Sequence, residues 1–188
     1  MQPEPWVILV TGPPGSGKSS VGAALARHLG AALLDQDSMT NPLVDVVARS
    51  IGATSYDDPA LSALVREARY ECVFSAALDC VRSGTNSVLI APFTQERRHL
   101  DTWQQLATRI SQAGGKPAMA WIRIDADELS RRLSRRGATR DANKLENLQN
   151  YLAGLDLAPP VGPFVEVNAQ STIKQQVKDL AQELIQLH

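Results

Sequence analysis

The chain has few of the sequence features that are typical of secreted, membrane-spanning or nucleic-acid-binding proteins. Only 2 of its 188 residues are cysteine and 5% are aromatic. No apolar run approaches the ~20 residues that a membrane helix needs, and the N-terminus does not resemble a signal peptide. A net charge of -1 gives no general attraction to nucleic acid or to a membrane surface. We therefore expect a cytoplasmic protein without general nucleic-acid or membrane binding.

The few cysteines and histidines form no pattern that suggests a disulfide or a metal site. Cys72 and Cys80 fall on one predicted helix, where their spacing corresponds to about 12 Å of axial rise. That separation is too long for a disulfide. We expect reduced thiols in the core or in a groove. His28, His99 and His188 lack the spacing of metal ligands.

The length and composition favour a single buried domain. The chain has 188 residues, with 44% hydrophobic and 21% charged residues, which is typical of one globular domain and too short for two. It contains no internal repeat and no linker-like stretch. We predict one domain over residues 1–188.

Strand and helix signals alternate along the chain, which is typical of a parallel sheet with helices on both faces. Strands are expected at residues 7–10, 31–34, 87–91, 118–124 and 164–167. Helices are expected at residues 20–29, 42–52, 59–82, 98–112, 127–136 and 142–152, and at the C-terminus. The predicted fold is α/β and doubly wound, and such folds bind ligands beyond the carboxyl ends of the strands. For the long helix we expect an apolar face made by Leu61, Leu64, Val65, Ala68, Cys72, Ala76 and Cys80.

Residues 12–19, Gly-Pro-Pro-Gly-Ser-Gly-Lys-Ser, fit the phosphate-binding loop G-x-x-x-x-G-K-[ST]. The loop follows the apolar run 6–10 and opens an amphipathic stretch, as a P-loop requires. Its glycines let backbone N–H groups converge on an anion at a helix N-terminus. Lys18 can reach the β- and γ-phosphates, and the Ser19 hydroxyl can ligate Mg²⁺. The sequence thus predicts a Mg²⁺-dependent ATP site formed by Gly12, Pro13, Pro14, Gly15, Ser16, Gly17, Lys18, Ser19 and Ser20.

Two carboxylates, Asp35 and Asp37, follow the second predicted strand. Because strand residues alternate sides, both can point the same way. One can hold a water on the metal that Ser19 ligates, and the other can accept a proton from an attacking hydroxyl. We assign Asp35 to the metal shell through water and Asp37 to the base and acceptor contact. The two roles could be exchanged, and Asp37 could instead cap the next segment or form a turn.

The third predicted strand, residues 87–91, lacks the acid that closes a Walker B strand, and no guanine-reading motif is present. Because this acid is missing, we expect Asp35 to take its role in metal binding. Its absence also counts against a motor ATPase and a switch GTPase.

Several arginines cluster after the fourth predicted strand: Arg131, Arg132, Arg135, Arg136 and Arg140. Like charges at i,i+4 cost a few tenths of a kcal/mol per pair, which a bound polyphosphate would offset. We predict a lid at about residues 135–145, with Arg132 and Arg136 on the nucleotide and phosphates and Arg140 on the γ-phosphate. The alternative is a solvated basic face that pairs with Asp125, Asp127 and Glu128.

Other side chains give weaker signals. Asn168 and Ala169 follow the last strand and are expected beside the adenine, or else form an ordinary turn. The acceptor pocket is expected to include Asn41, Arg69 and Phe93 beside Asp37, and neighbouring candidates are Tyr70, Arg97 and Arg98. Each of these could instead be structural.

The P-loop, the Asp-x-Asp of residues 35–37 and the Arg132-x-x-x-Arg136 pair resemble the nucleoside-monophosphate-kinase-like branch of the P-loop kinases. Shikimate kinase, gluconate kinase, chloramphenicol phosphotransferase and zeta toxin belong to this branch. The likeness to its small AAA-type ATP-binding kinases covers most of the chain, including residues 37–43, 91–93 and 136–144. The resemblance implies a sheet of order 2-3-1-4-5, a mobile lid, and ATP- and Mg²⁺-dependent phosphorylation of a small-molecule hydroxyl. It also implies that Lys18 and Ser19 bind phosphate and metal, that Asp37 is the base, and that Arg136 and Arg140 are lid arginines.

The sequence departs from the known acceptor-binding motifs of this branch. No shikimate or gluconate acceptor motif is present, and Thr40 stands where polynucleotide kinases have an arginine after Asp37. The leading hypothesis is a small-molecule kinase, either a monomer or a homodimer. A nucleotide-dependent regulatory ATPase and a kinase of a macromolecular acceptor (an RNA end or a protein) are the alternatives.

Overall fold

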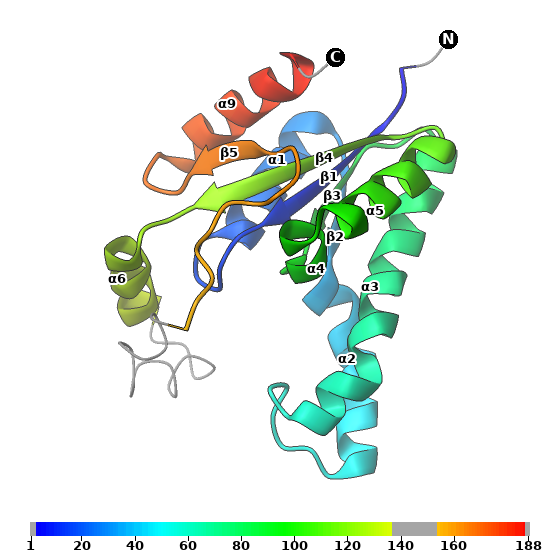
Figure 1. Ribbon diagram of the computed structural model, residues 1–188, viewed down its shortest axis with the longest axis vertical. Helices are drawn as coiled ribbons and strands as arrows, with labels where there is room; N and C mark the ends of the chain where they lie inside the picture. Colours follow the sequence, from blue (N-terminus) through cyan, green and yellow to red (C-terminus); the bar gives the residue numbers. More distant parts are fainter. Residues whose placement is uncertain (1–2, 137–153, 187–188) are drawn as a thin grey trace.

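A computed structural model describes residues 3–136 and 154–186 (Figure 1). Its sheet has five parallel strands in the order β2-β3-β1-β4-β5. The fold class is confirmed, as is the strand order that the resemblance implied. The strands are β1 Trp6–Thr11, β2 Ala32–Asp35, β3 Ser87–Ile90, β4 Lys116–Arg123 and β5 Val165–Asn168.

Helices cover both faces of this sheet (Figure 1). One core cluster joins α1 and α9 to side chains such as Ile8 and Val10, and the other joins α3 and α5 to Val7 and Leu9. Because successive residues of β1 alternate between the two clusters, the strand is buried on both faces, as parallel strands usually are. The helices are α1 Lys18–Leu29, α2 Gln36–Ile51, α3 Pro59–Arg82, α4 Thr94–Arg98, α5 Leu100–Gln112, α6 Ala126–Arg136 and α9 Ile173–Gln186.

The carboxyl ends of the parallel strands share one edge, where the P-loop follows β1. The Thr11 hydroxyl donates to the Pro92 carbonyl at 2.8 Å and so joins the ends of β1 and β3. The α2–α3 pair extends away from the sheet on one side of the view, and α6 lies on the other (Figure 1). Within the described residues, no helix is both long and apolar enough to cross a membrane.

Helix α2 begins at Gln36, so the expected start at residue 42 is wrong. Asp35 is the N-cap, and its Oδ1 accepts hydrogen bonds from the backbone N–H groups of Asp37 and Ser38 at 3.0 and 3.4 Å. Pro42 lies inside the helix. It removes one backbone donor, yet the helix continues because it is capped upstream and packs against α3. Asp37 therefore lies in the first helical turn, and the strand-alternation argument for its orientation fails.

The expected apolar face of α3 is correct only in part, because Leu61 is buried while Leu64, Ala68 and Cys72 are exposed. The buried residues are Leu61, Val73, Ala77, Leu78 and Val81, whereas Leu64 is 62% exposed. The first half of α3 extends past the sheet with α2 and has no core to face on most sides (Figure 1).

The cysteines and the later elements show smaller differences. Both cysteines are free thiols, but Cys72 is exposed rather than buried in a core or groove, and Cys80 is half-buried. The helix expected at residues 98–112 is α5, which begins at Leu100, and the short helix α4 before it was not expected. The helix expected at residues 142–152 and most of the expected lid lie outside the described residues.

The Asp35 cap gives a stability prediction. Asp35→Ala should lower the free energy of unfolding in urea by about 0.5–2 kcal/mol, because two N–H groups of α2 lose their acceptor. Asp35→Asn should cost much less, since asparagine is an equally good N-cap.

The matched controls lie at the start of α3. Asp58 caps Ala60 and Leu61 in the same way, so Asp58→Ala should cost a similar amount. Asp57→Ala, one residue earlier, should cost less. Equal stability of Asp35→Ala and the wild type would contradict the capping role.

Candidate active site

The P-loop joins β1 to α1 through backbone conformations that require glycine. Gly17 is the N-cap of α1 with a φ of 103°, and no side chain caps the helix. The first N–H groups of α1 thus have no acceptor within the helix, and helix N-termini of this kind bind anions. A Cβ on Gly12 would lie 2.9 Å from Ser16 Oγ and 3.1 Å from the Ile122 carbonyl oxygen, so a side chain there would push the loop apart.

Lys18 lies across this loop. Its Nζ donates hydrogen bonds to the carbonyl oxygens of Gly12 and Pro13 at 2.9 and 3.0 Å. The ammonium group is thereby held at the loop that presents the N–H groups. Amide donors at a helix N-terminus together with a lysine form the donor set that a triphosphate needs, so the residues fit the expected nucleotide.

Ser19 and Asp35 meet beside the loop. The Ser19 hydroxyl donates to Asp35 Oδ2 at 3.4 Å, while Asp35 Oδ1 serves the α2 cap. Such oxygen ligands suit Mg²⁺, which usually takes one or two protein oxygens and completes its shell with phosphate and water. The described residues contain no group of three His, Cys, Asp or Glu side chains suited to a metal.

Arg132 ties α6 to the nucleotide loop. Its Nε donates to Glu128 at 2.8 Å, its Nη1 donates to the Ser16 carbonyl at 2.8 Å, and its Nη2 donates to the Ala169 carbonyl. The expected contact of Arg132 with the nucleotide stays a prediction, since these three donors already have protein partners. What the contacts do achieve is to hold α6 against the P-loop.

The other predicted lid residues divide into two groups. Arg131 forms an exposed ion pair with Glu128 at 3.0 Å, as the solvated-face alternative has it. Arg135 is exposed. The side chain of Arg136 and all of Arg140 lie outside the described residues.

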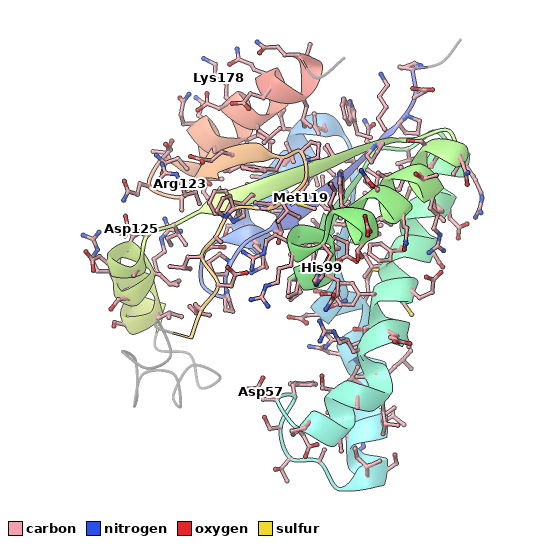
Figure 2. All side chains as sticks on the ribbon, in the orientation of Figure 1. Asp57, His99, Met119, Arg123, Asp125 and Lys178 are labelled. Carbon is pink, nitrogen blue, oxygen red and sulfur yellow. The ribbon has the colours of Figure 1, made fainter. Side chains whose placement is uncertain are left out.

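The turn after β5 lies next to Arg132. Asn168 Oδ1 accepts from the Gln170 N–H at 3.0 Å, and Ala169 is fully buried. The Gln170 amide donates to Asp125 Oδ2 at 2.7 Å, which links the turn to the start of α6 (Figure 2). The local bonds are those of an ordinary turn, and a contact with adenine stays a prediction.

On the α2–α3 side, Arg69 gathers the predicted acceptor residues. Its Nη2 donates to Asp37 Oδ1 at 2.6 Å and to Asn41 Oδ1 at 2.8 Å, and its Nε donates to Thr40 Oγ1 at 2.8 Å. The Arg69 side chain is 19% exposed and that of Asp37 is 65% exposed. The second Asp37 oxygen has no hydrogen-bond partner among the described residues. Asp37, Asn41 and Arg69 thus lie together, with one carboxylate oxygen open.

Phe93, in contrast, lies in the core. Its ring is fully buried and packs against Tyr70 and Phe74, with centroids 6.0 and 6.1 Å away. Burial and the nearby Glu96 carboxylate raise the pKa of Tyr70 to about 12. Because the Phe93 ring is enclosed, it can support an acceptor pocket from beneath, and direct contact with an acceptor would need it to move.

Arg97 and Arg98 are engaged elsewhere. Both bind Asp156 Oδ2, at 2.6 and 2.7 Å, and Arg97 also donates to the Asp156 and Ala158 carbonyls. They anchor the segment that returns to β5, and a contact of either residue with an acceptor stays a prediction.

Asp45 and Tyr56 lie beyond Asp37 and Asn41 on the α2 side and were not expected from the sequence. The Tyr56 hydroxyl donates to Asp45 Oδ1, which raises the pKa of Tyr56. Asp45 lies two helical turns beyond Asp37 on α2. The signal was the spacing of Asp37, Asn41 and Asp45, four residues apart, and it becomes readable only once the helix is known to start at Gln36.

The comparisons with known proteins agree with this geometry. An AAA domain family model matches residues 7–158. The search of curated proteins found no match.

Solved structures give the same fold. A gluconokinase from Sinorhizobium meliloti is 23% identical with a TM-score of 0.61, covering 98% of this chain and 94% of its own. A sugar kinase from Janibacter is 17% identical with a TM-score of 0.63, covering 96% and 95%. A shikimate kinase from Aquifex aeolicus is 16% identical with a TM-score of 0.53, covering 95% and 96%. Because the family model matches residues 7–158, the chain belongs to the AAA domain family.

Proposed function

We propose that this protein is a kinase that transfers the γ-phosphoryl group of ATP to a hydroxyl of a small molecule. The observation that carries the proposal is the adjacency of two constellations at the start of α2. Asp35 contacts Ser19 of the P-loop, and Asp37, two residues later, contacts Arg69 of α3. A nucleotide on the loop would therefore have its terminal phosphate close to an open carboxylate.

In this proposal the chain binds the nucleotide, orients the acceptor and takes up the acceptor's proton. The α1 amides and Lys18 hold the phosphates, and Ser19 with Asp35 (through water) holds Mg²⁺, which offsets negative charge when it is bound. Arg132, Arg136 and Arg140 act from the lid side, and Asn168 and Ala169 lie beside the base. These residue roles are part of the proposal.

Asp37 is the proposed base. The acceptor oxygen forms a bond to the γ-phosphorus, the bond from that phosphorus to ADP breaks, and the acceptor proton passes to Asp37. Arg69 holds Asp37 Oδ1 at 2.6 Å, which leaves Oδ2 to receive the proton. Arg69 thus positions the base.

The likeness to kinases in the solved structures supports phosphoryl transfer. The names gluconokinase, sugar kinase and shikimate kinase all describe transfer to small molecules. These three structures match 95–98% of this chain. We propose that residues 1–188 act as one catalytic domain.

The direct test is an acceptor screen. ADP release from Mg·ATP is measured with sugars, polyols, nucleosides, nucleoside monophosphates and hydroxylated antibiotics. An acceptor should raise the rate in the wild type, and Lys18→Ala should lower the stimulated rate by about 100-fold or more, because the ammonium donor is lost. Equal ADP release by Lys18→Ala and the wild type with every acceptor would overturn the proposal.

Asp37→Asn separates a kinase from a regulatory ATPase. The affinity for ATP should stay within about twofold, while transfer should fall by about 10²–10⁴-fold because the base is lost. Binding is measured by calorimetry and transfer by product formation. Asp57→Asn, which removes an equal charge from the α2–α3 loop (Figure 2), is the control. It should change neither the affinity for ATP nor the rate of transfer. Unchanged transfer in Asp37→Asn would exclude Asp37 as the base.

A further inference from the structure

A line of polar side chains runs along α2, away from the P-loop. Asp37, Asn41 and Asp45 are spaced four residues apart, so they lie on neighbouring positions of one helical face. From Asp37 to Asp45 the helix rises about 12 Å. Asp37 and Asn41 both bind Arg69, which faces them from α3.

Tyr56 closes the far end of this line. It lies in the loop between α2 and α3, is 51% exposed, and donates its hydroxyl hydrogen to Asp45 Oδ1. The bond to Asp45 is the main cause of the raised pKa of Tyr56, and the charges of Arg69 and Asp37 also act on its hydroxyl. The Tyr56 hydroxyl therefore belongs to the same polar surface as the proposed base.

The charges on this surface favour hydrogen-bond donors over anions. Arg69 already has Asp37, Thr40 and Asn41 as acceptors, so its positive charge is balanced within the protein. Asp45 adds a further negative charge at the far end.

Two other arginines lie in this region. Arg66 acts on Tyr70 and Glu96, which places its charge toward α4. Arg49 is exposed and lies one helical turn beyond Asp45 on α2. An anionic group bound directly at Asp45 would thus meet the Asp45 carboxylate first, with Arg49 one turn farther along the helix.

We infer, building on the proposed function, that Asp45 and Tyr56 determine acceptor specificity and that the acceptor is a polyhydroxyl molecule whose far end is uncharged or carries an ammonium group. The second Asp45 oxygen and the Tyr56 oxygen accept hydrogen bonds from its hydroxyl or ammonium donors. A phosphate or carboxylate at that end is disfavoured.

The spacing sets the size of this acceptor. Two O–H···O bonds of about 2.8 Å each, one to Asp37 and one to Asp45, leave roughly 6 Å of the helical rise for the acceptor itself. That length corresponds to the oxygens on opposite sides of one sugar or cyclitol ring. The inferred substrate class is therefore a single-ring or similarly short polyol.

The test uses matched acceptors that differ only in charge. Aldohexose, hexitol and cyclitol skeletons are each supplied in neutral, amino, carboxylate and monophosphate forms, and ADP release by the full-length protein is measured with Mg·ATP. The neutral or amino member of the best skeleton should exceed its acidic counterparts at least tenfold in kcat/KM. Preference for a carboxylate or phosphate member would overturn the inference while leaving the kinase proposal intact. No stimulation by any acceptor, with ATP still bound, would overturn both.

Variants then test whether Asp45 and Tyr56 set the preference between neutral and acidic acceptors. Tyr56→Phe and Asp45→Asn should raise the KM for the best neutral acceptor about three- to tenfold and leave kcat within twofold. Asp45→Lys should shift the ratio of acidic to neutral kcat/KM at least tenfold toward the acidic member. Asp57→Asn, whose carboxylate has no hydrogen bond among the described residues, should leave KM and the ratio unchanged.

A purely structural role gives a different pattern. If the Tyr56–Asp45 bond only holds the loop to α2, the variants lower the melting temperature while KM and the acidic-to-neutral ratio stay at wild-type values. That result would contradict the inference. Tyr56 is half-exposed, so Tyr56→Phe should fold, and circular dichroism confirms this before the kinetics are measured.

Discussion

The first backbone N–H groups of α1 cannot bond within their own helix, and the rest of the site depends on where they point. Gly17 ends the loop in a left-handed conformation and leaves these donors without a side-chain cap. Five of the six β1 residues, Val7 to Thr11, are fully buried, so the strand holds the loop at the carboxyl edge of the sheet. An anion at this edge can accept hydrogen bonds from donors that have no acceptor within their own helix.

One carboxylate connects the folding of α2 to this site. Asp35 uses Oδ1 to cap the helix and Oδ2 to accept from Ser19. The cap fixes the first turn of α2 and with it Asp37, which Arg69 then holds from α3. The helix start therefore sets the distance between the phosphate loop and the proposed base. In the proposed function the same carboxylate also holds Mg²⁺ through water, so helix capping and metal binding would depend on one side chain.

Local signals made the fold and the P-loop predictable from the sequence. Apolar runs bounded by glycine and proline marked the five strands, and the lysine and serine of the loop stand in a pattern that few other structures produce. The start of α2 was misplaced because Pro42 suggested a first helical turn, whereas the Asp35 cap overrides it. The face of α3 was misjudged because half of that helix has no sheet to pack on.

Long-range contacts explain what remained beyond sequence reasoning. The partners of Arg97 lie at Asp156, and the partner of Tyr56 lies across a loop at Asp45. No periodic pattern in the sequence indicates contacts between such residues. Phe93 was expected in a pocket because it follows a strand end, but its backbone has a φ of 45° and its ring is buried in the core, so its contact with an acceptor stays a prediction. Only packing distinguishes these cases.

The central claim is that the P-loop binds a nucleoside triphosphate with the help of Mg²⁺. Calorimetric titration of the protein with a non-hydrolysable ATP analogue, with and without Mg²⁺, tests it most directly. The account predicts one site per chain, with affinity that falls at least tenfold when Mg²⁺ is removed. Absence of saturable binding with Mg²⁺ present would contradict it.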